Sequence, residues 1–155
     1  PIRKRLEDAK PHTRGIEHKI HIGLTDNMDQ VRDAFAAVMR GDYGLASVKA
    51  FWVHSTGRMG ILDHAVQRRI WQIAGEIHYD KVFFQHLEDE DAFTGEFDPK
   101  NPLSHSLRQN QESETIQVER QIRNAVDAKF EGVFYIAHVS NPDTVDFIES
   151  FKNIM

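Results

Sequence analysis

Residues 45–53 read LASVKAFWV, a stretch dominated by apolar and β-favouring residues. Two later runs have the same character, KVFFQH at 81–86 and VFYIAHV at 133–139, and a shorter run, KIHIGL, lies at 19–24. Nearly continuous runs of this kind are typical of strands that are covered on both faces. The sequence therefore predicts four strands, and it predicts that the last three are covered on both sides.

Helix signals separate these runs. The pairs Asp26-Asn27 and Asn141-Pro142, and Asp63 between them, can each cap the start of a helix. The alternation of strands and helices predicts an α/β fold with a parallel sheet and helical crossovers. The apolar positions expected to face the core are Val31, Ala34, Phe35 and Val38; Val66, Ile70, Ile73, Ala74 and Ile77; Ile116, Ile122, Ala125 and Val126 within 112–129; and Val145, Ile148 and Phe151.

The length limits how much of a closed sheet the chain can form. Its 155 residues, 40% of them apolar, are enough for a single domain spanning 1–155. A complete (β/α)8 barrel needs about 250 residues, so four β/α units supply about half a barrel or a small open sheet. The first 14 residues are expected to be the end of another helix, which Pro11 stops. Because the chain starts with Pro1 rather than Met, we expect a piece of a longer protein.

Composition argues against several classes of protein. The chain has no cysteine, which excludes a disulfide scaffold and thiolate zinc sites and agrees with a cytoplasmic location. No apolar run approaches the ~18 residues of a membrane span, so no membrane partner is expected. The net charge of −5 argues against a general nucleic-acid binder.

The stretch 88–111 has no periodicity. Between residues 88 and 98 it carries six acidic residues and no basic one. A solvated surface loop explains this composition, while long loops inside compact domains are often functional or mobile. Both interpretations stay open from the sequence.

Two histidines stand at the carboxyl ends of predicted strands, His86 in KVFFQH and His138 in VFYIAHV. Ligands of parallel α/β folds gather at these strand ends, and imidazole is a common ligand of divalent transition metals. The two histidines could therefore share a metal ion. Alternatively, each could be a polar residue that is satisfied locally.

Lys49 lies inside the apolar run 45–53. An ammonium group in a buried strand carries a large desolvation penalty, so this lysine must be paired, neutral or chemically converted. A neutral lysine can react with carbon dioxide to form a carbamate, which is an anionic oxygen ligand. The alternative is an ion pair with an acid such as Glu88 or Asp89.

The segment HSTGRMG at 54–60 follows the same run. It contains no phosphate-loop pattern, yet its polar side chains could meet an anionic substrate. A plain polar loop is an equally good interpretation. Trp52 and Trp71 are expected in the core, and the remaining histidines are expected on the surface or in local packing: His12, His18, His21, His64, His78 and His105.

Three segments together resemble one family: LASVKAFWVHSTGRMGIL at 45–62, VFFQHLEDE at 82–90 and FYIAHVSNPDTVDFI at 134–148. In this order they look like the central strands of dihydroorotases, which belong to the metal-dependent amidohydrolase superfamily. IGLTDNMDQ at 22–30 and NPLSHSLRQ at 101–109 are also similar to bacterial enzymes of this group. The resemblance covers almost the whole chain.

The resemblance implies a TIM-barrel fold with one or two zinc ions at the carboxyl ends of the strands. It implies that Lys49, as a carbamate, and the histidines His86 and His138 are metal ligands. Glu88 would contact His86 without binding the metal itself. A substrate loop would be formed by His54, Ser55 and Thr56. The reaction of the family is the reversible cyclisation of N-carbamoyl-L-aspartate to L-dihydroorotate in pyrimidine synthesis.

The chain departs from the family pattern in three respects. It has no His-x-His motif, no counterpart of the aspartate on the eighth strand that acts as general base, and no arginine beside the first histidines for the substrate carboxylate. The segments thus resemble strands three to six of eight. Three ligands could still hold one zinc ion, but loss of the general base alone removes about 10²–10⁴-fold in rate. We expect little or no dihydroorotase activity from this chain by itself.

A half-barrel also has two open sheet edges, which invite pairing with other chains. We therefore expect a homo-oligomer, or a complex that covers these edges. Two alternatives to the enzyme fragment remain: a non-catalytic dihydroorotase-like half-barrel that serves as an assembly module, and an unrelated open α/β binding domain in which Lys49 pairs with an acid.

Overall fold

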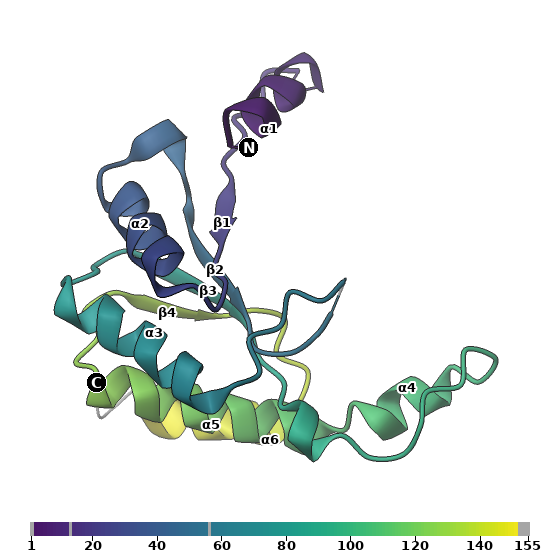
Figure 1. The fold of residues 1–155 in the computed structure, drawn as a ribbon. Helices are drawn as coiled ribbons and strands as arrows, with labels where there is room; N and C mark the ends of the chain where they lie inside the picture. Colours follow the sequence, from purple (N-terminus) through teal and green to yellow (C-terminus); the bar gives the residue numbers. More distant parts are fainter. Residues whose placement is uncertain (1, 13, 56, 152–155) are drawn as a thin grey trace.

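The computed structural model describes residues 2–12, 14–55 and 57–151 (Figure 1). Its strands form one sheet in the order β1-β2-β3-β4, and every neighbouring pair is parallel. Each strand lies inside one of the predicted apolar runs, so the expected parallel α/β fold is confirmed. The strands are β1 (His21–Gly23), β2 (Ser47–Phe51), β3 (Val82–His86) and β4 (Val133–Ile136).

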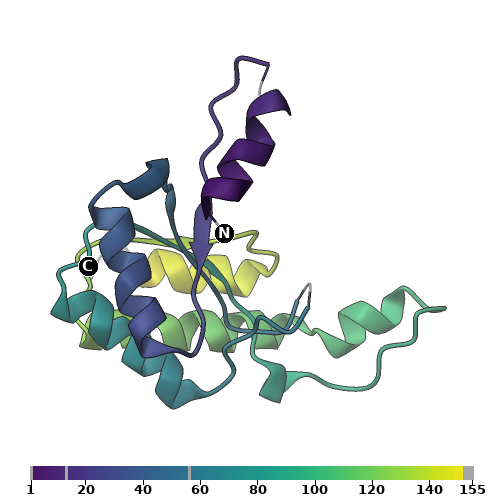
Figure 2. The ribbon, with the colours of Figure 1, turned by 45° about the horizontal axis from the view of Figure 1, so that its top comes forward.

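Helices connect and follow the strands. The predicted helices are α2 (Met28–Met39), α3 (His64–Glu76), α5 (Gln111–Asp127) and α6 (Pro142–Phe151), with α1 (Ile2–Ala9) before the sheet. The aperiodic stretch 88–111 also contains short helices, η3 (Glu90–Ala92) and α4 (Leu103–Arg108). Figures 1 and 2 show α1 and α4 standing away from the sheet on extended segments. Two further short turns are η1 (Lys10–His12) and η2 (Asp42–Gly44).

The predicted capping residues start the helices. Asn27 Oδ1 accepts hydrogen bonds from the amides of Asp29 and Gln30 at 2.9 and 3.0 Å. Asp63 caps α3 in the same way, and Asn141 Oδ1 accepts from the first turn of α6 at 3.1 Å. These bonds satisfy amides that have no partner within the helix, which is why each helix begins where the sequence predicts.

The two faces of the sheet have different surroundings. Residues alternate along β2 and β3, and Val48, Ala50 and Phe83 are fully buried among residues of α2, α3 and α5. On the opposite face, Tyr135 of β4 is 49% exposed. The prediction that these strands are covered on both faces is therefore wrong for the described residues. The runs look continuous because the uncovered face also carries aromatic side chains.

The helix-covered face holds the core. Trp52 and Trp71 are almost completely buried, as predicted. The indole of Trp71 stacks on Phe134 with ring centroids 5.2 Å apart and contacts Phe83 at 4.7 Å. Aromatic pairs of this kind add stabilisation beyond the area that they bury.

A buried hydrogen-bond network joins α3 to α5. Gln67 Oε1 accepts from Gln117 Nε2 at 3.2 Å and from Gln121 Nε2 at 2.7 Å, and Trp71 Nε1 donates to Gln121 Oε1 at 2.7 Å. Gln67 Nε2 in turn donates to the carbonyl of Ile61 at 2.7 Å. The network thus fixes the register of two helices and the end of the loop that precedes α3.

None of the helices in the described ranges is long and apolar enough to cross a membrane.

We predict that Gln67→Leu lowers the free energy of unfolding by about 2–5 kcal/mol, because it leaves two amide donors and one carbonyl buried without partners. Urea denaturation followed by circular dichroism measures this change. Gln72→Leu, on the exposed face of the same helix, is the control and should change stability by less than about 0.5 kcal/mol. Equal stability of the two variants would show that the buried network contributes nothing.

Candidate functional site

The carboxyl ends of β3 and β4 bring two histidines together. His86 is the last residue of β3, and His138 lies two residues beyond the end of β4. The pairing of Gln85 with Ile136 sets the two strands side by side. Nδ1 of His86 then lies 2.8 Å from Nε2 of His138, with ring centroids 4.5 Å apart. The structure thus places together the two side chains that the sequence singled out at separate strand ends.

The backbone at His138 is unusual. Its φ angle is +40°, in a left-handed region that side chains with a Cβ rarely adopt. Such a conformation costs on the order of 1 kcal/mol or more and persists only where the surroundings enforce it. Backbone strain at one of two converging imidazoles is a property that functional sites often show.

Glu114 of α5 binds the segment that follows His138. Its Oε2 accepts hydrogen bonds from the amide and hydroxyl of Ser140 at 2.9 and 2.8 Å, and its Oε1 accepts from the amide of Asn141 at 3.0 Å. Glu114 as a residue is 8% exposed. It therefore holds the segment directly after His138 against the start of α5. No local pattern in the sequence indicates this role, because Glu114 lies far from His138 in the chain.

Glu88 lies on the other side of the His86 ring. Its Oε1 is 3.4 Å from His86 Nε2, while Oε2 is buried and has no hydrogen-bond partner among the described residues. A carboxylate behind an imidazole fixes the tautomer and the orientation of the ring. Both nitrogens of His86 are thereby engaged, Nδ1 toward His138 and Nε2 toward Glu88.

Lys49 lies on the same uncovered face of the sheet as His86. In the register of β2 and β3, Lys49 pairs with Phe84, and Phe51 pairs with His86. Nζ of Lys49 lies 3.9 Å from the ring centroid of Phe84 and 4.8 Å from that of Phe51. Among the described residues, no hydrogen bond or ion pair joins Lys49 to either histidine; the link is the Phe51 ring, whose centroid is 5.8 Å from that of His86.

The alternative pairing of Lys49 with Glu88 or Asp89 is not what the structure shows. Asp89 forms an ion pair with Arg120, and Glu88 faces His86. Burial lowers the pKa of Lys49 from its ordinary value. Its contacts with two rings act in the opposite direction, since a cation over an aromatic face is stabilised. An amine of lowered pKa is neutral more often, which is the state that carbamate formation requires.

Only part of the predicted substrate loop lines a cavity. His54 and Ser55 line a cavity of about 310 Å³, together with Phe97, His105, Arg108 and Gln109. The amide of His54 donates to Glu90 Oε1, and Nδ1 of His54 accepts from the amide of Gly60 at 3.1 Å. Thr56 lies outside the described residues. The sequence did not indicate that α4 would contribute to this cavity.

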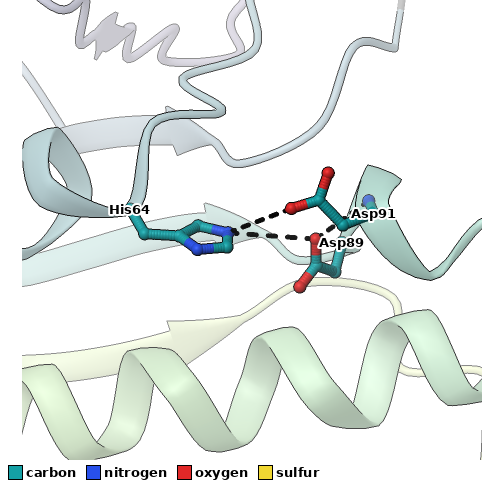
Figure 3. Close-up of side chains that lie close together, drawn as sticks. All are labelled: His64, Asp89 and Asp91. Atoms are coloured by element: carbon teal, nitrogen blue, oxygen red, sulfur yellow. Dashed lines mark hydrogen bonds and ion pairs between the residues drawn. The ribbon is translucent and has the colours of Figure 1, made fainter.

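A further group of possible ligands was not expected from the sequence. Nε2 of His64 lies 3.9 Å from Asp89 Oδ1 and 4.0 Å from Asp91 Oδ2 (Figure 3). However, Asp89 already accepts from Arg120 and from the amide of Asp91. These bonds match the role of anchoring η3 against α3 and α5, and His64 fits the local packing that the sequence predicted for it.

The lowered pKa of Lys49 predicts a pH dependence of stability. The unfolded chain binds more protons than the folded one between the two pKa values, so stability rises with pH through the window that ends near the ordinary lysine value of about 10.4. Lys49→Met should therefore be more stable than the parent at pH 7, and the gain should shrink toward pH 10. Urea midpoints measured with a metal chelator test this. A variant less stable at pH 7 would mean that the ring contacts outweigh burial.

Comparisons with known proteins bear on the fold. No family model matches the chain, and no curated protein matches it. Among solved structures, D-hydantoinase from a Bacillus sp. AR9 superposes with a TM-score of 0.72 at 18% identity, covering 99% of this chain and 34% of that one. A second D-hydantoinase crystal structure gives 0.70 at 19% identity with the same coverage. The chain thus spans about a third of the length of these structures, and its four parallel β/α units match part of their fold.

Proposed function

We propose that this chain carries one side of the metal site of a cyclic amidohydrolase of the dihydroorotase type. The observation that carries the proposal is the 2.8 Å approach of His86 Nδ1 to His138 Nε2 at the carboxyl edge of a barrel-type sheet. The resemblance of the strand and loop motifs to dihydroorotases supports the same assignment. The likeness to D-hydantoinases concerns the fold and agrees with a cyclic amide as substrate.

The residues fit a zinc ion. Two imidazoles bring their ring nitrogens to 2.8 Å, at hydrogen-bond distance, and paired histidines are a common part of catalytic zinc sites. The carboxylate of Glu88 lies 3.4 Å from Nε2 of His86. In metal sites, a histidine ligand commonly donates its second N–H to an acid in this position. The buried Oε2 of Glu88 has no hydrogen-bond partner among the described residues, and a nearby cation would supply one. A bound zinc ion would polarise the amide carbonyl of the substrate and activate water.

Each residue has a distinct task in this proposal. His86 and His138 would hold the metal through Nδ1 and Nε2, and Glu88 would keep the Nε2–H tautomer of His86. Lys49 would complete the site as a carbamate: its neutral amine nitrogen bonds to the carbon of carbon dioxide and releases one proton, leaving an anionic oxygen ligand. Burial lowers the pKa of Lys49 and so favours the neutral amine.

The expected reaction is the interconversion of L-dihydroorotate and N-carbamoyl-L-aspartate. In the described residues no acid stands in the place of the family's general base, so the chain on its own is expected to bind metal with little or no turnover. Metal binding therefore tests the proposed site, whereas activity also depends on groups outside these strands.

We predict that the chain binds about one zinc ion and that His86→Asn and His138→Asn each weaken binding at least tenfold, since each removes a ligand. Calorimetric titration with zinc chloride and elemental analysis measure this. His18→Asn, at an exposed position, is the matched control and should bind as the parent does. Unchanged zinc affinity in both site variants would exclude the metal site proposed here.

We also propose that the uncovered face and the two strand edges are covered by a second copy of this chain. β1 and β4 are the edges of an all-parallel sheet, and the face that includes Val133 and Tyr135 is exposed. A two-fold axis parallel to the strands would place β4 of each copy beside β1 of the other. Both pairs of edges would then be satisfied at once, and eight strands would close around a packed interior.

Light scattering after gel filtration should therefore give twice the chain mass of 17.9 kDa. Tyr135→Lys should shift the protein to the monomer, because it places a charge in the covered face. Val145→Lys, on the exposed side of α6, is the control and should leave the mass unchanged. A well-folded parent of single-chain mass would contradict the assembly.

A further inference from the structure

We infer that Glu114 is the positioning residue of His138, and that the first turn of α5 sets the contact between His138 and His86. This inference rests on the proposed function, in which both histidines are metal ligands, and it names the residue that keeps one of them in place. Glu114 acts through the backbone of Ser140 and Asn141, the second and third residues after His138.

Glu114 binds this segment with both of its carboxylate oxygens. Oε2 accepts from the amide and the hydroxyl of Ser140, and Oε1 accepts from the amide of Asn141. Hydrogen bonds to a carboxylate are about twice as strong as those between neutral groups. Because one planar carboxylate binds two successive amides, the peptide planes before and after Ser140 both have a fixed orientation.

The backbone at His138 is thereby held on both sides. Upstream, the amide of Ala137 donates to the carbonyl of Gln85 at 3.1 Å, which continues the pairing of β3 with β4. Downstream, Glu114 binds Ser140, and His138 lies between these two anchors with its φ angle of +40°. Such a conformation persists only where the surrounding structure holds it. Loss of the downstream anchor would let the backbone relax and would move the imidazole away from its partner.

The same turn of α5 also binds the segment that follows His86. The amide of Asp89 donates to the carbonyl of Ser113 at 3.1 Å, and the carboxylate of Asp89 pairs with Arg120 of α5. Ser113 and Glu114 are consecutive, so the segments after β3 and after β4 are fastened to adjacent residues of one helix. This arrangement fixes how far apart the two histidine-bearing segments lie.

The position suits a negatively charged side chain. Glu114 lies in the first turn of α5, and the amides that it binds lie at the start of α6, which runs beside α5 (Figures 1 and 2). The amino-terminal end of a helix carries a partial positive charge, which stabilises a carboxylate there. Glu112 lies in the same turn but is exposed, so it offers a matched control.

The first test uses the isotope-labelled full chain without metal. In the parent, NMR of the ring nitrogens should show the hydrogen bond between His86 Nδ1 and His138 Nε2, with a nuclear Overhauser contact between the rings. Glu114→Gln replaces one acceptor oxygen with an NH2 group, so both signals should be lost. Ser140→Ala removes only the hydroxyl bond and should shift the same signals less, which keeps the test available if Glu114→Gln does not fold. Glu112→Gln should leave the signals unchanged.

A second buried contact between α5 and α6 separates positioning from general support of the fold. The hydroxyl oxygens of Thr115 and Thr144 lie 2.8 Å apart, and Thr144 is fully buried. Thr144→Val should lower the urea midpoint yet leave the ring signals of both histidines unchanged. Equal changes of the ring signals in Thr144→Val and Glu114→Gln would overturn the inference, because Glu114 would then only support the fold.

The second test adds zinc chloride. Glu114→Gln should raise the dissociation constant for zinc about tenfold, as for other residues that hold a metal ligand in place, and Glu112→Gln should not change it. A parent chain that binds no zinc would remove the proposed function, while the ring signals without metal would still decide the position of His138. Unchanged ring signals in Glu114→Gln would overturn this inference even if zinc binds.

Discussion

Parallel pairing of β2, β3 and β4 is the constraint on which the rest of the structure depends. Because all strands run in the same direction, their carboxyl ends meet along one edge, and the register of β3 with β4 sets which residues face each other there. Phe51 stands beside His86, and the chain that leaves β4 places His138 next to the same ring. A shift by one residue would turn these side chains to the other face of the sheet.

Two kinds of buried polar contact keep that edge in shape. The glutamine network between α3 and α5 holds the helices that support β2 and β3. Glu114 of α5 then fixes the backbone after His138 through three hydrogen bonds. Buried polar groups stabilise a fold only when their donors and acceptors are hydrogen-bonded, because each buried group without a partner lowers the stability. The site is therefore supported by the helix-covered core, while its chemistry faces the uncovered side.

The uncovered face links the fold to the proposed function. In a closed barrel this face points inward, and the aromatic side chains of β2, β3 and β4 would form its interior. In the single chain they stay half-exposed, with Phe84 stacked on Tyr135 at 4.7 Å and Lys49 above Phe84. Partial burial on this face lowers the pKa of Lys49. The exposed aromatic surface supports the expectation that further strands cover it.

Much of the fold could be predicted from the sequence, because helix caps and hydrophobic periodicity depend on residues that are close together in the chain. Asn27, Asp63 and Asn141 start helices as expected, and the apolar runs form strands. The histidines at the strand ends were also found in this way. The contact of His86 with His138, the reach of Glu114 and the placement of α4 beside Ser55 follow instead from strand register and helix packing. These join residues far apart in the chain, and no local pattern records such distances.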